Sequence, residues 1–417
     1  MEIRRDIYLN KLINRMHNGM IKVVTGIRRS GKSYLLFTIF KDYLLSEGVD
    51  EDHIISIELE RLENKKYRDP YMILEQIKTQ IIDSKDYYIF LDEVQLLDEF
   101  EDVLNSLLHI KNVDVYVTGS NSKFLSKDII TEFRGRGDEV HVYPISFREY
   151  MTVFNGDKYE GWSSYVRFGG LPLTVTMNSD EQRVEYLTRL FEETYIKDII
   201  ERNHIEKKQE LNDLINVLAS GIGSLTNPSK IVATFNSAIQ SDISLNTVRS
   251  YIEHLEDAFI ISEANRYDVK GRKYIGTPLK YYFEDVGLRN ARLGFRQVEE
   301  THLMENIIYN ELRVRGFSVD VGVVMKRNRT EAGVQEKRQL EIDFIANQGS
   351  RRYYIQSAFS IPDEEKREQE KASLINVGDS FKKIIIVKDV VKPWHDDDGI
   401  LTISLYDFLL DEKSLEL

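Results

Sequence analysis

The sequence contains no cysteine, only seven prolines, and no long apolar run. Without cysteine, the protein cannot form disulfide bonds, use a thiolate nucleophile or bind zinc through thiolates. A membrane-spanning helix needs roughly 20 consecutive apolar residues, and no segment approaches that length. The start of the chain, MEIRRDIYLNKLINRMHN, is charged and amphipathic and lacks the apolar core of a signal peptide. Together these absences predict a cytoplasmic protein.

The composition is typical of a folded protein with several domains. Apolar residues make up 42% of the 417 residues and charged residues 30%, and a chain of this length exceeds what one ordinary core accommodates. The formal net charge is -13. A negative total argues against broad electrostatic binding of nucleic acid, although a local basic face could still provide it.

A glycine-rich loop near the start of the chain has the pattern of a phosphate-binding loop. The segment GIRRSGKS, residues 26–33, fits G-x-x-x-x-G-K-[ST] at each fixed position. It follows IKVVT, typical of a buried strand, and precedes YLLFTIFKDYLL, which has helical apolar spacing. Gly26 and Gly31 let backbone N–H groups converge on phosphate oxygens, and the helix dipole favours the same anion. We expect Lys32 to reach the β- and γ-phosphates of ATP and Ser33 to ligate Mg²⁺.

The predicted nucleotide contacts span the whole loop and the first residues of the helix. They are Gly26, Ile27, Arg28, Arg29, Ser30, Gly31, Lys32, Ser33 and Tyr34. Within this set, the side chains of Arg28 and Arg29 are expected to pack or to form ion pairs rather than to act in catalysis. A chance Lys-Ser pair in a glycine-rich turn would not account for the strand and the helix on either side.

A second buried strand is predicted to complete the site. In YYIFLDEVQLL, residues 87–91 are apolar, and Asp92 and Glu93 follow directly. Asp92 is expected to hold Mg²⁺ through its water shell, and Glu93 to polarise the water that attacks the γ-phosphate. The alternative interpretation is a strand that ends in a solvated acidic turn.

A third strand, VDVYVTGSNSKFL, ends in polar residues that could sense the γ-phosphate. Ser120 and Asn121 are the candidates, because they would lie between the two other motifs. Serine and asparagine are also good helix caps. The sequence therefore permits either role for Ser120 and Asn121, sensing the γ-phosphate or capping the following helix.

Two arginines in EFRGRGDEVHVYPISFREY are candidates for stabilising charge in the transition state. Arg134 and Arg136 flank a glycine, and an arginine held in this way can neutralise charge on the transferred phosphoryl group. It could act within its own chain or in the site of a neighbouring subunit. An ordinary pair of surface arginines is the alternative.

These motifs give the chain a resemblance to a known family. It resembles the prokaryotic AAA-like ATPases that carry a C-terminal domain of unknown function. The matching segments run through most of the chain: TGIRRSGKSYLL, IFLDEVQLL, VTGSNSKFLS, FRGRGDEVHVYPISFREY, RFGGLPLTV, LFEETYIKDIIERNHI, YIEHLEDAFII and KYYFEDVGLRNA. The resemblance implies an ATP-binding P-loop core with a small lid, then a winged helix, then the C-terminal domain. It implies no settled biological role.

The predicted fold class is α/β, with a P-loop (AAA-like) parallel sheet followed by a helical lid, a winged helix and a smaller α/β domain. That last domain resembles the restriction-endonuclease-like fold. The predicted domains are the ATPase core at residues 1–145, the lid at 146–205, the winged helix at 206–285 and the C-terminal domain at 286–417.

The winged helix is predicted from three short helices and a basic hairpin. The helices are LNDLINVLASGIG, NPSKIVATFNSAI and SLNTVRSYIEHLEDAF, and the hairpin is IISEANRYDVKGRKYI. In a winged helix, the third helix can enter the major groove of DNA. Here that helix offers only Arg249 as an obvious cation, set among Glu253, Glu256 and Asp257. A scaffolding or protein-binding role is therefore favoured over DNA reading.

The C-terminal domain has part of a nuclease pattern. Active members of the restriction-endonuclease-like fold use a helix Glu and a strand Asp with a second acid, and a Lys two residues later. Glu305 and Asp343 fill the first two places, but Gln356 stands at the second acid and Ala358 at the lysine. We therefore expect the fold without working nuclease chemistry.

The sequence as a whole predicts an ATP-binding, Mg²⁺-dependent ATPase whose nucleotide state repositions the winged-helix and C-terminal modules. Its partner would be another protein or DNA. A nucleotide-dependent DNA-binding regulator with little turnover is one alternative, and an ATP-gated nuclease is another. A homo-oligomer would be required if Arg134 or Arg136 serves a neighbouring site.

Overall fold

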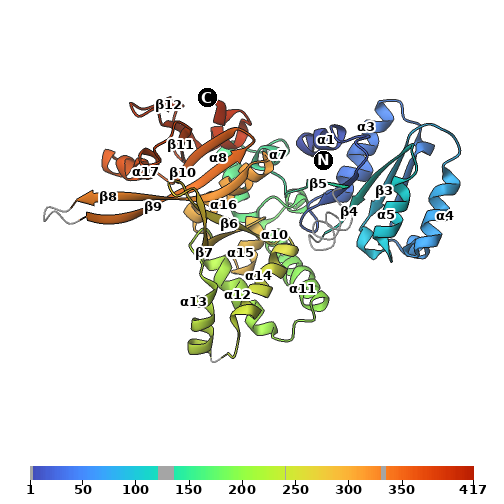
Figure 1. Ribbon diagram of the computed structural model, residues 1–417, viewed down its shortest axis with the longest axis horizontal. Coiled ribbons are helices and arrows are strands. Elements are labelled where there is room, and N and C mark those ends of the chain that lie inside the picture. The colour runs from blue at the N-terminus through green and yellow to red at the C-terminus, as the bar shows by residue number, and fades with distance from the viewer. Residues whose placement is uncertain (1–2, 121–135, 240, 330–334) are drawn as a thin grey trace. The chain divides into compact units, whose positions relative to one another are not determined.

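The computed structural model describes residues 3–120, 136–239, 241–329 and 335–417 (Figure 1). Contacts within the chain divide it into two compact units. Unit 1 consists of Met1–Pro144 and Glu256–Ile260, and unit 2 of Ile145–Leu255 and Ile261–Leu417. In the described ranges, no helix is both long and apolar enough to cross a membrane.

Five parallel strands form the centre of unit 1, in the order β2–β3–β4–β1–β5. Their bounds are β1 Ile21–Thr25, β2 Ile54–Glu58, β3 Tyr87–Asp92, β4 Val113–Thr118 and β5 Gly137–His141. The three strands predicted around the nucleotide site are β1, β3 and β4, and they are neighbours in the sheet. Because the strands are parallel, their carboxyl ends meet at one edge. The predicted α/β fold with a parallel P-loop sheet is confirmed.

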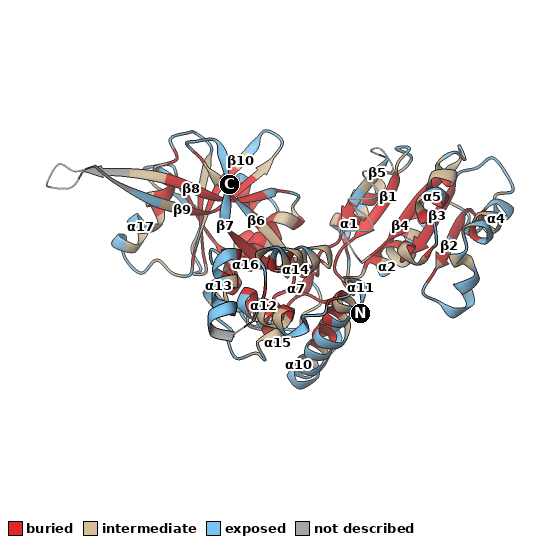
Figure 2. Cartoon of the chain, turned by 60° about the horizontal axis from the view of Figure 1, so that its bottom comes forward, coloured by how far each residue is buried: buried red, intermediate tan, exposed pale blue. Residues whose placement is uncertain are grey.

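Helices cover both faces of this sheet (Figure 1). The helical segments of unit 1 are α1 Asp6–Ile13, α2 Lys32–Tyr34, the π-helical η1 Leu35–Phe40, α3 Lys41–Ser46, η2 Glu51–His53, η3 Leu62–Arg68, α4 Pro70–Gln80, η4 Val94–Leu96 and α5 Phe100–Leu108. Alternation along β3 supplies both faces with apolar side chains. Ile89 and Leu91 pack with α4 and α5, whereas Tyr88 and Phe90 pack with α1 and η1. The strands are consequently buried while the helices expose their outer faces (Figure 2).

Unit 2 begins with a series of helices. They are α7 Phe147–Met151, α8 Lys158–Phe168, α9 Pro172–Thr176, α10 Asp180–Arg189, the π-helical η6 Leu190–Ile196, α11 Lys197–Arg202, α12 Lys208–Ser220, α13 Pro228–Thr234, the π-helical η7 Phe235–Ile239 and α14 Leu245–Asp257. The three helices predicted from 211 onward are confirmed as α12, α13 with η7, and α14. Ser244 caps α14, since its hydroxyl accepts the N–H of Thr247 at 3.1 Å.

A mixed sheet of eight strands forms the rest of unit 2, in the order β12–β13–β11–β10–β9–β8–β6–β7. The strands are β6 Ile261–Asp268, β7 Lys273–Phe283, β8 Ser318–Arg329, β9 Gln335–Gln348, β10 Arg351–Ala358, β11 Lys382–Val387, β12 Trp394–His395 and β13 Leu401–Ser404. The helices are α15 Val286–Arg292, α16 Glu300–Val314, α17 Glu364–Ile375, α18 Leu405–Leu410 and the short η8 Ser414–Glu416. The basic hairpin is β6–β7, and it extends the same sheet as β8 to β13 because β6 pairs with β8.

Two motifs that are far apart in the sequence, RFGGLP and FEDVGLRNA, are joined by buried hydrogen bonds in unit 2. Asp285 caps α15, where its carboxylate accepts the Leu288 N–H at 2.9 Å, and it also accepts the Gly170 N–H at 2.7 Å. Asn290 donates to the carbonyl oxygen of Val166 at 3.0 Å, near the end of α8. These bonds hold the helices before the sheet against the first helix after β7.

Burial raises the pKa of Asp285 to about 6, although backbone N–H donors oppose the shift. The protonated carboxyl therefore stabilises the fold fully below pH 4, and this contribution is lost as the pH rises through 6. The difference from the ordinary value of 3.8 corresponds to about 3 kcal/mol.

The variant Asp285→Asn cannot ionise, so it provides a test of this linkage. We expect the free energy of unfolding of the wild type, relative to the variant, to fall by about 3 kcal/mol between pH 4 and pH 7. Chemical unfolding can be followed by tryptophan fluorescence, because Trp162 and Trp394 both lie in unit 2. The exposed Asp389→Asn is the matched control. A difference in stability between the wild type and Asp285→Asn that stays constant with pH would contradict the assignment.

Candidate nucleotide-binding site

The predicted phosphate loop connects β1 to α2 at the carboxyl edge of the parallel sheet. Gly26 and Gly31 both have positive φ angles, 135° and 96°. Residues that carry a Cβ atom rarely adopt such angles. A Cβ on Gly26 would lie 2.2 Å from the carbonyl oxygen of Val142. The first glycine is therefore required by the close approach of the chain beyond β5 as well as by its backbone conformation.

Lys32 is directed back into the loop. Its Nζ donates to the carbonyl oxygens of Gly26 at 2.9 Å and Ile27 at 3.1 Å. The side chain is buried, with 4% exposure. The ammonium group is thus held at the centre of the loop, where its charge favours an anion.

The two predicted magnesium ligands lie in contact. The Ser33 hydroxyl donates to Oδ1 of Asp92 at 2.9 Å, and Thr118, the last residue of β4, donates to the same oxygen. Burial raises the pKa of Asp92, while the hydrogen bonds from Thr118 and Ser33 oppose the shift. A hydroxyl and a carboxylate at this distance form an oxygen donor set that suits Mg²⁺.

Glu93 lies directly beyond β3 with a left-handed backbone, φ 49°. Its N–H donates to Thr118 Oγ1 at 3.0 Å, and its side-chain Oε2 accepts hydrogen bonds from Gln95 and from Ser120, the latter at 3.2 Å. The structure therefore brings Ser120 to the carboxylate predicted to act on water. Asn121, the other sensing candidate, lies outside the described residues.

The predicted arginines fall in different places. Arg134 lies outside the described residues. The carbonyl of Arg136 accepts the N–H of Ile21 at 2.9 Å, which places this residue at the amino ends of β1 and β5, opposite the loop. Arg28 forms an exposed ion pair with Glu60 at 3.3 Å. Arg29 has a positive φ of 65°, and Tyr34 is 46% exposed.

Two residues of this site were not predicted from the sequence. Thr118 could have been found, because a polar residue at the end of β4 must neighbour the end of β3. Arg5 carried no such signal. Its guanidinium is buried and donates to the carbonyl oxygens of Ser30 at 3.0 Å and Tyr143 at 2.6 Å, so it ties the loop to the chain after β5.

Comparison with known proteins agrees with this geometry. A family described as an AAA domain matches residues 18–151, which contain the loop, Asp92 and Glu93. An uncharacterized protein of Haemophilus influenzae is 33% identical to the chain over 414 residues, which is 98% of either protein. The chain belongs to the AAA-like ATPase family.

Other likenesses extend over the rest of the chain. A domain of unknown function (DUF8612) matches residues 159–299 of this AAA-like ATPase. The uncharacterized protein MJ1544 of Methanocaldococcus jannaschii is 27% identical over 390 residues, which is 89% of this chain and 80% of that protein. The Walker-type ATPase paby2304 of Pyrococcus abyssi is 16% identical, covers 70% of this chain and 96% of its own, and has a TM-score of 0.49. That structural likeness is too low to carry an argument.

One of the predicted nuclease residues of unit 2, Glu305, pairs with a lysine that was not predicted from the sequence. Lys280, on β7, forms ion pairs with Glu305 at 2.9 Å and with Glu341 at 2.8 Å. Tyr282 donates to the same Glu305 oxygen at 2.7 Å. Burial, together with the charge of Glu305, raises the pKa of the neighbouring Asp343. In the described part of the chain, no group of three or more histidines and acids is arranged to hold a metal ion.

The positions that depart from the nuclease pattern have other contacts. Gln356 accepts a hydrogen bond from Ser373 at 3.3 Å, and Ala358 is buried in an apolar cluster. The N–H of Ser357 donates to Asp343 at 2.7 Å. Lys280 on β7 therefore balances the charge of Glu305, and the backbone N–H of Ser357 stabilises the carboxyl group of Asp343.

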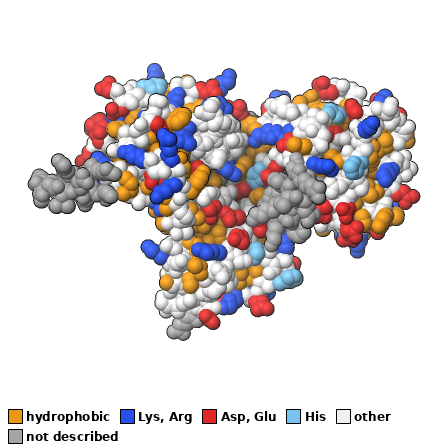
Figure 3. Space-filling view, in the orientation of Figure 1, with side chains coloured by type: hydrophobic (Ala, Val, Ile, Leu, Met, Phe, Trp, Pro, Cys, Tyr) orange, Lys and Arg blue, Asp and Glu red, His pale blue; other side chains and the backbone are white. Residues whose placement is uncertain are grey.

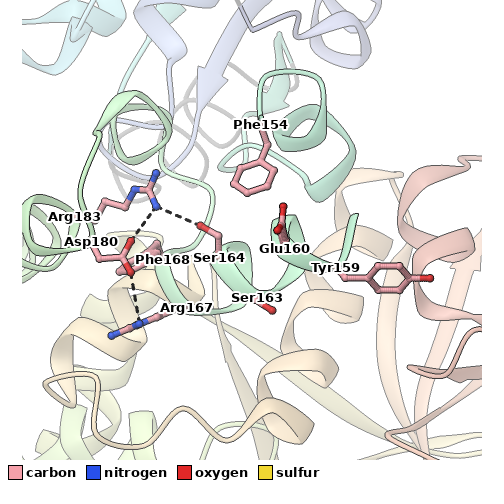
Figure 4. Close-up of a pocket in the computed structure, with 9 residues that line it drawn as sticks. All are labelled: Phe154, Tyr159, Glu160, Ser163, Ser164, Arg167, Phe168, Asp180 and Arg183. Atoms are coloured by element: carbon pink, nitrogen blue, oxygen red, sulfur yellow. Dashed lines mark hydrogen bonds and ion pairs between the residues drawn. The ribbon is translucent and has the colours of Figure 1, made fainter. Parts of the chain in front are cut away.

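Unit 2 also contains an open cavity of about 550 Å³ (Figure 4). Its lining residues are Phe154, Tyr159, Glu160, Ser163, Ser164, Arg167, Phe168, Asp180 and Arg183. Arg183 is already engaged, since it donates to the carbonyl oxygens of Thr174 and Met177 and pairs with Asp180 at 3.3 Å. With two acids beside two arginines, this cavity lacks the character of a phosphate site.

Replacing Lys280 by methionine tests whether it balances the acidic group. Glu305 and Glu341 would lose the counter-charge of a buried lysine, and we expect the free energy of unfolding to fall by about 3 kcal/mol. Tryptophan fluorescence in denaturant measures this change for unit 2. Lys273→Met, at an exposed position on the same strand, should change stability by less than about 0.5 kcal/mol. Equal effects of the two variants would show that Lys280 has no such role.

Proposed function

We propose that this chain is a Mg²⁺-dependent ATPase that couples its nucleotide state to movement of its C-terminal modules. The observation that supports the proposal most directly is the contact between Ser33 and Asp92 at 2.9 Å. It brings the hydroxyl after the loop lysine to the acid at the end of β3, which is the arrangement that a nucleotide-bound Mg²⁺ needs.

The residues at the carboxyl edge then have separate roles. The backbone of the loop binds the phosphates, and Lys32 places its ammonium on the β- and γ-phosphates. Ser33 and Asp92 would hold Mg²⁺, which would neutralise phosphate charge. Glu93 takes the proton of the attacking water.

A path for coupling is provided by the way the chain crosses between its two units. It leaves unit 1 after Pro144 and returns at Glu256–Ile260, which comprises the last residues of α14 and the connection to β6. Within that segment, the ring of Phe259 packs on His141 with centroids 4.7 Å apart. His141 shares a hydrogen bond of 3.0 Å with Thr25, which directly precedes Gly26 of the loop. A change at the loop can therefore reach the end of α14 through adjoining side chains.

The modules that would move are those predicted from the sequence. We assign α12, α13, α14 and the hairpin β6–β7 to the winged helix, and the lid to the helices before it. The order α16, β8, β9, β10, α17, β11 supports a restriction-endonuclease-like arrangement, with three antiparallel strands and a crossover to the parallel β11. The ion pairs of Lys280 argue against a working nuclease. We propose a cytoplasmic protein that acts on a protein or a nucleic acid.

Arg136 bears on the oligomeric state. Its position at the amino ends of β1 and β5 is far from the loop of its own subunit along the strands. A catalytic role for Arg136 would therefore be played in a neighbouring subunit of a homo-oligomer.

Two variants separate nucleotide binding from hydrolysis. Lys32→Ala should weaken ATP binding at least tenfold, because the loop loses the ammonium group that is fixed at its centre. Glu93→Gln should bind ATP normally and lose at least 100-fold in kcat, because the amide cannot take the proton of water. Equilibrium titration with a fluorescent ATP analogue gives the affinities, and phosphate release gives kcat.

The exposed Lys78→Ala and Glu75→Gln, both on α4, are matched controls and should behave as the wild type. Wild-type turnover by Glu93→Gln would refute the role of Glu93. The same variant, loaded with ATP, is the form to use for capturing a partner.

A DNA-binding regulator remains the second candidate because of one exposed feature. Lys270, Arg272 and Lys273 are exposed at the turn of the β6–β7 hairpin, whereas Arg249 on α14 stands near Glu253. On the face seen in Figure 3, basic and acidic side chains are intermingled. The turn is thus a small basic site on a surface of mixed charge.

Adding duplex DNA to the ATPase assay distinguishes the two candidates. A DNA-dependent protein should turn over ATP faster with DNA, bind it more weakly as salt rises, and lose both effects in Lys270→Ala/Arg272→Ala. We expect no stimulation if the partner is a protein. Salt-dependent stimulation that the double variant abolishes would instead establish the nucleic-acid partner.

A further inference from the structure

Gln95 lies two residues after Glu93, within η4, and its side chain turns back to the catalytic edge of the sheet. Its amide nitrogen donates to Oε2 of Glu93. Ser120 donates to the same oxygen at 3.2 Å. The Glu93 carboxylate is thus oriented from two sides by neutral donors, one from its own turn and one from the end of β4.

The other end of the Gln95 amide is the unusual feature. Its Oε1 is buried and has no hydrogen-bond partner among the described residues. A buried acceptor without a partner is destabilising, because it has lost its hydrogen bonds to water without gaining others. Rotating the amide by 180° would not help, because the oxygen would then face the carboxylate of Glu93. The acceptor is therefore fixed beside the catalytic glutamate.

A water molecule placed between these two acceptors would donate one hydrogen to each of them. Water has two hydrogens, and two acceptors side by side, a carboxylate and an amide oxygen, fix its orientation and direct its lone pair away from them. A protonated ammonium or guanidinium group could also donate to both acceptors, but it has no lone pair with which to attack phosphorus, whereas water has.

We propose that Gln95 positions the attacking water together with Glu93. This inference rests on the proposed ATPase function. The water donates one hydrogen to Glu93 and the other to Oε1 of Gln95. Its oxygen forms a bond to the γ-phosphorus while the bond from that phosphorus to the β,γ-bridging oxygen breaks. Glu93 takes one proton, the second hydrogen stays with the new phosphate, and ADP leaves with both electrons of the broken bond.

The test compares Gln95→Leu with the wild-type full-length chain. Leucine keeps the approximate size but can neither orient Glu93 nor accept a hydrogen from water. We expect kcat to fall about 10- to 100-fold, while the affinity for the fluorescent ATP analogue stays within about twofold. Gln80→Leu, at an exposed position on α4, is the matched control and should leave both values unchanged.

A double variant distinguishes positioning of water from a structural effect. If Gln95 acts with Glu93 on one water, then Glu93→Gln/Gln95→Leu should hydrolyse ATP no more slowly than Glu93→Gln alone in single-turnover assays. A multiplied loss in the double variant would overturn the proposal. A parallel fall in affinity and kcat in Gln95→Leu would also overturn it.

Gln95→Glu provides a second test if the leucine variant does not fold. It retains an acceptor but loses the donor to Glu93, so kcat should again fall at unchanged ATP affinity. Wild-type kcat in Gln95→Glu or Gln95→Leu contradicts the inference. Failure of the wild type to hydrolyse ATP would instead contradict the proposed function, and the same assays show which of the two has failed.

Discussion

Asp92 ends a strand in which every residue is buried, and its carboxylate has exchanged water for the hydroxyls of Ser33 and Thr118. An anion placed in this way is unfavourable by itself, and burial accordingly raises its pKa. Proximity to a cation is the simplest means of stabilising it. Three strands and the phosphate loop must end at the same edge for this to be possible, and the parallel order of the sheet makes them do so.

The loop is also held by contacts that its sequence pattern does not predict. Gly26 is pressed against the carbonyl of Val142, and Arg5 joins the carbonyls of Ser30 and Tyr143. The chain after β5 thus supports the loop on one side. The same stretch carries His141, which contacts both Thr25 and Phe259. Loop geometry and the segment leading to β6 are therefore connected through one short piece of chain.

Unit 2 contains a group of acidic side chains around the buried Lys280. Glu305 and Asp343 are the acids predicted from the nuclease pattern; Lys280 on β7 pairs with Glu305, and its charge also acts on Asp343. The positive charge of a buried ammonium stabilises carboxylates in much the same way as a metal ion does, but an ammonium cannot activate water as a Lewis acid. The ion pair with Lys280 thus gives Glu305 a structural role in this unit.

The sequence by itself determined the phosphate loop, the three strands of the site and the three helices α12 to α14, because these depend on local spacing and on runs of apolar residues. It also predicted one site for Lys32, Ser33, Asp92 and Glu93 from their distance to a glycine or to a strand end, and the structure places all four at the carboxyl edge of the sheet. Only the tertiary structure decided which distant groups meet. Arg5 and Lys280 act on carbonyls and carboxylates that are far away in the sequence, and no spacing rule encodes such a contact. The hairpin β6–β7 likewise looks self-contained in the sequence, but pairing with β8 makes it part of the larger sheet, because a strand edge with free N–H and C=O groups is stabilised by any strand that can pair with it.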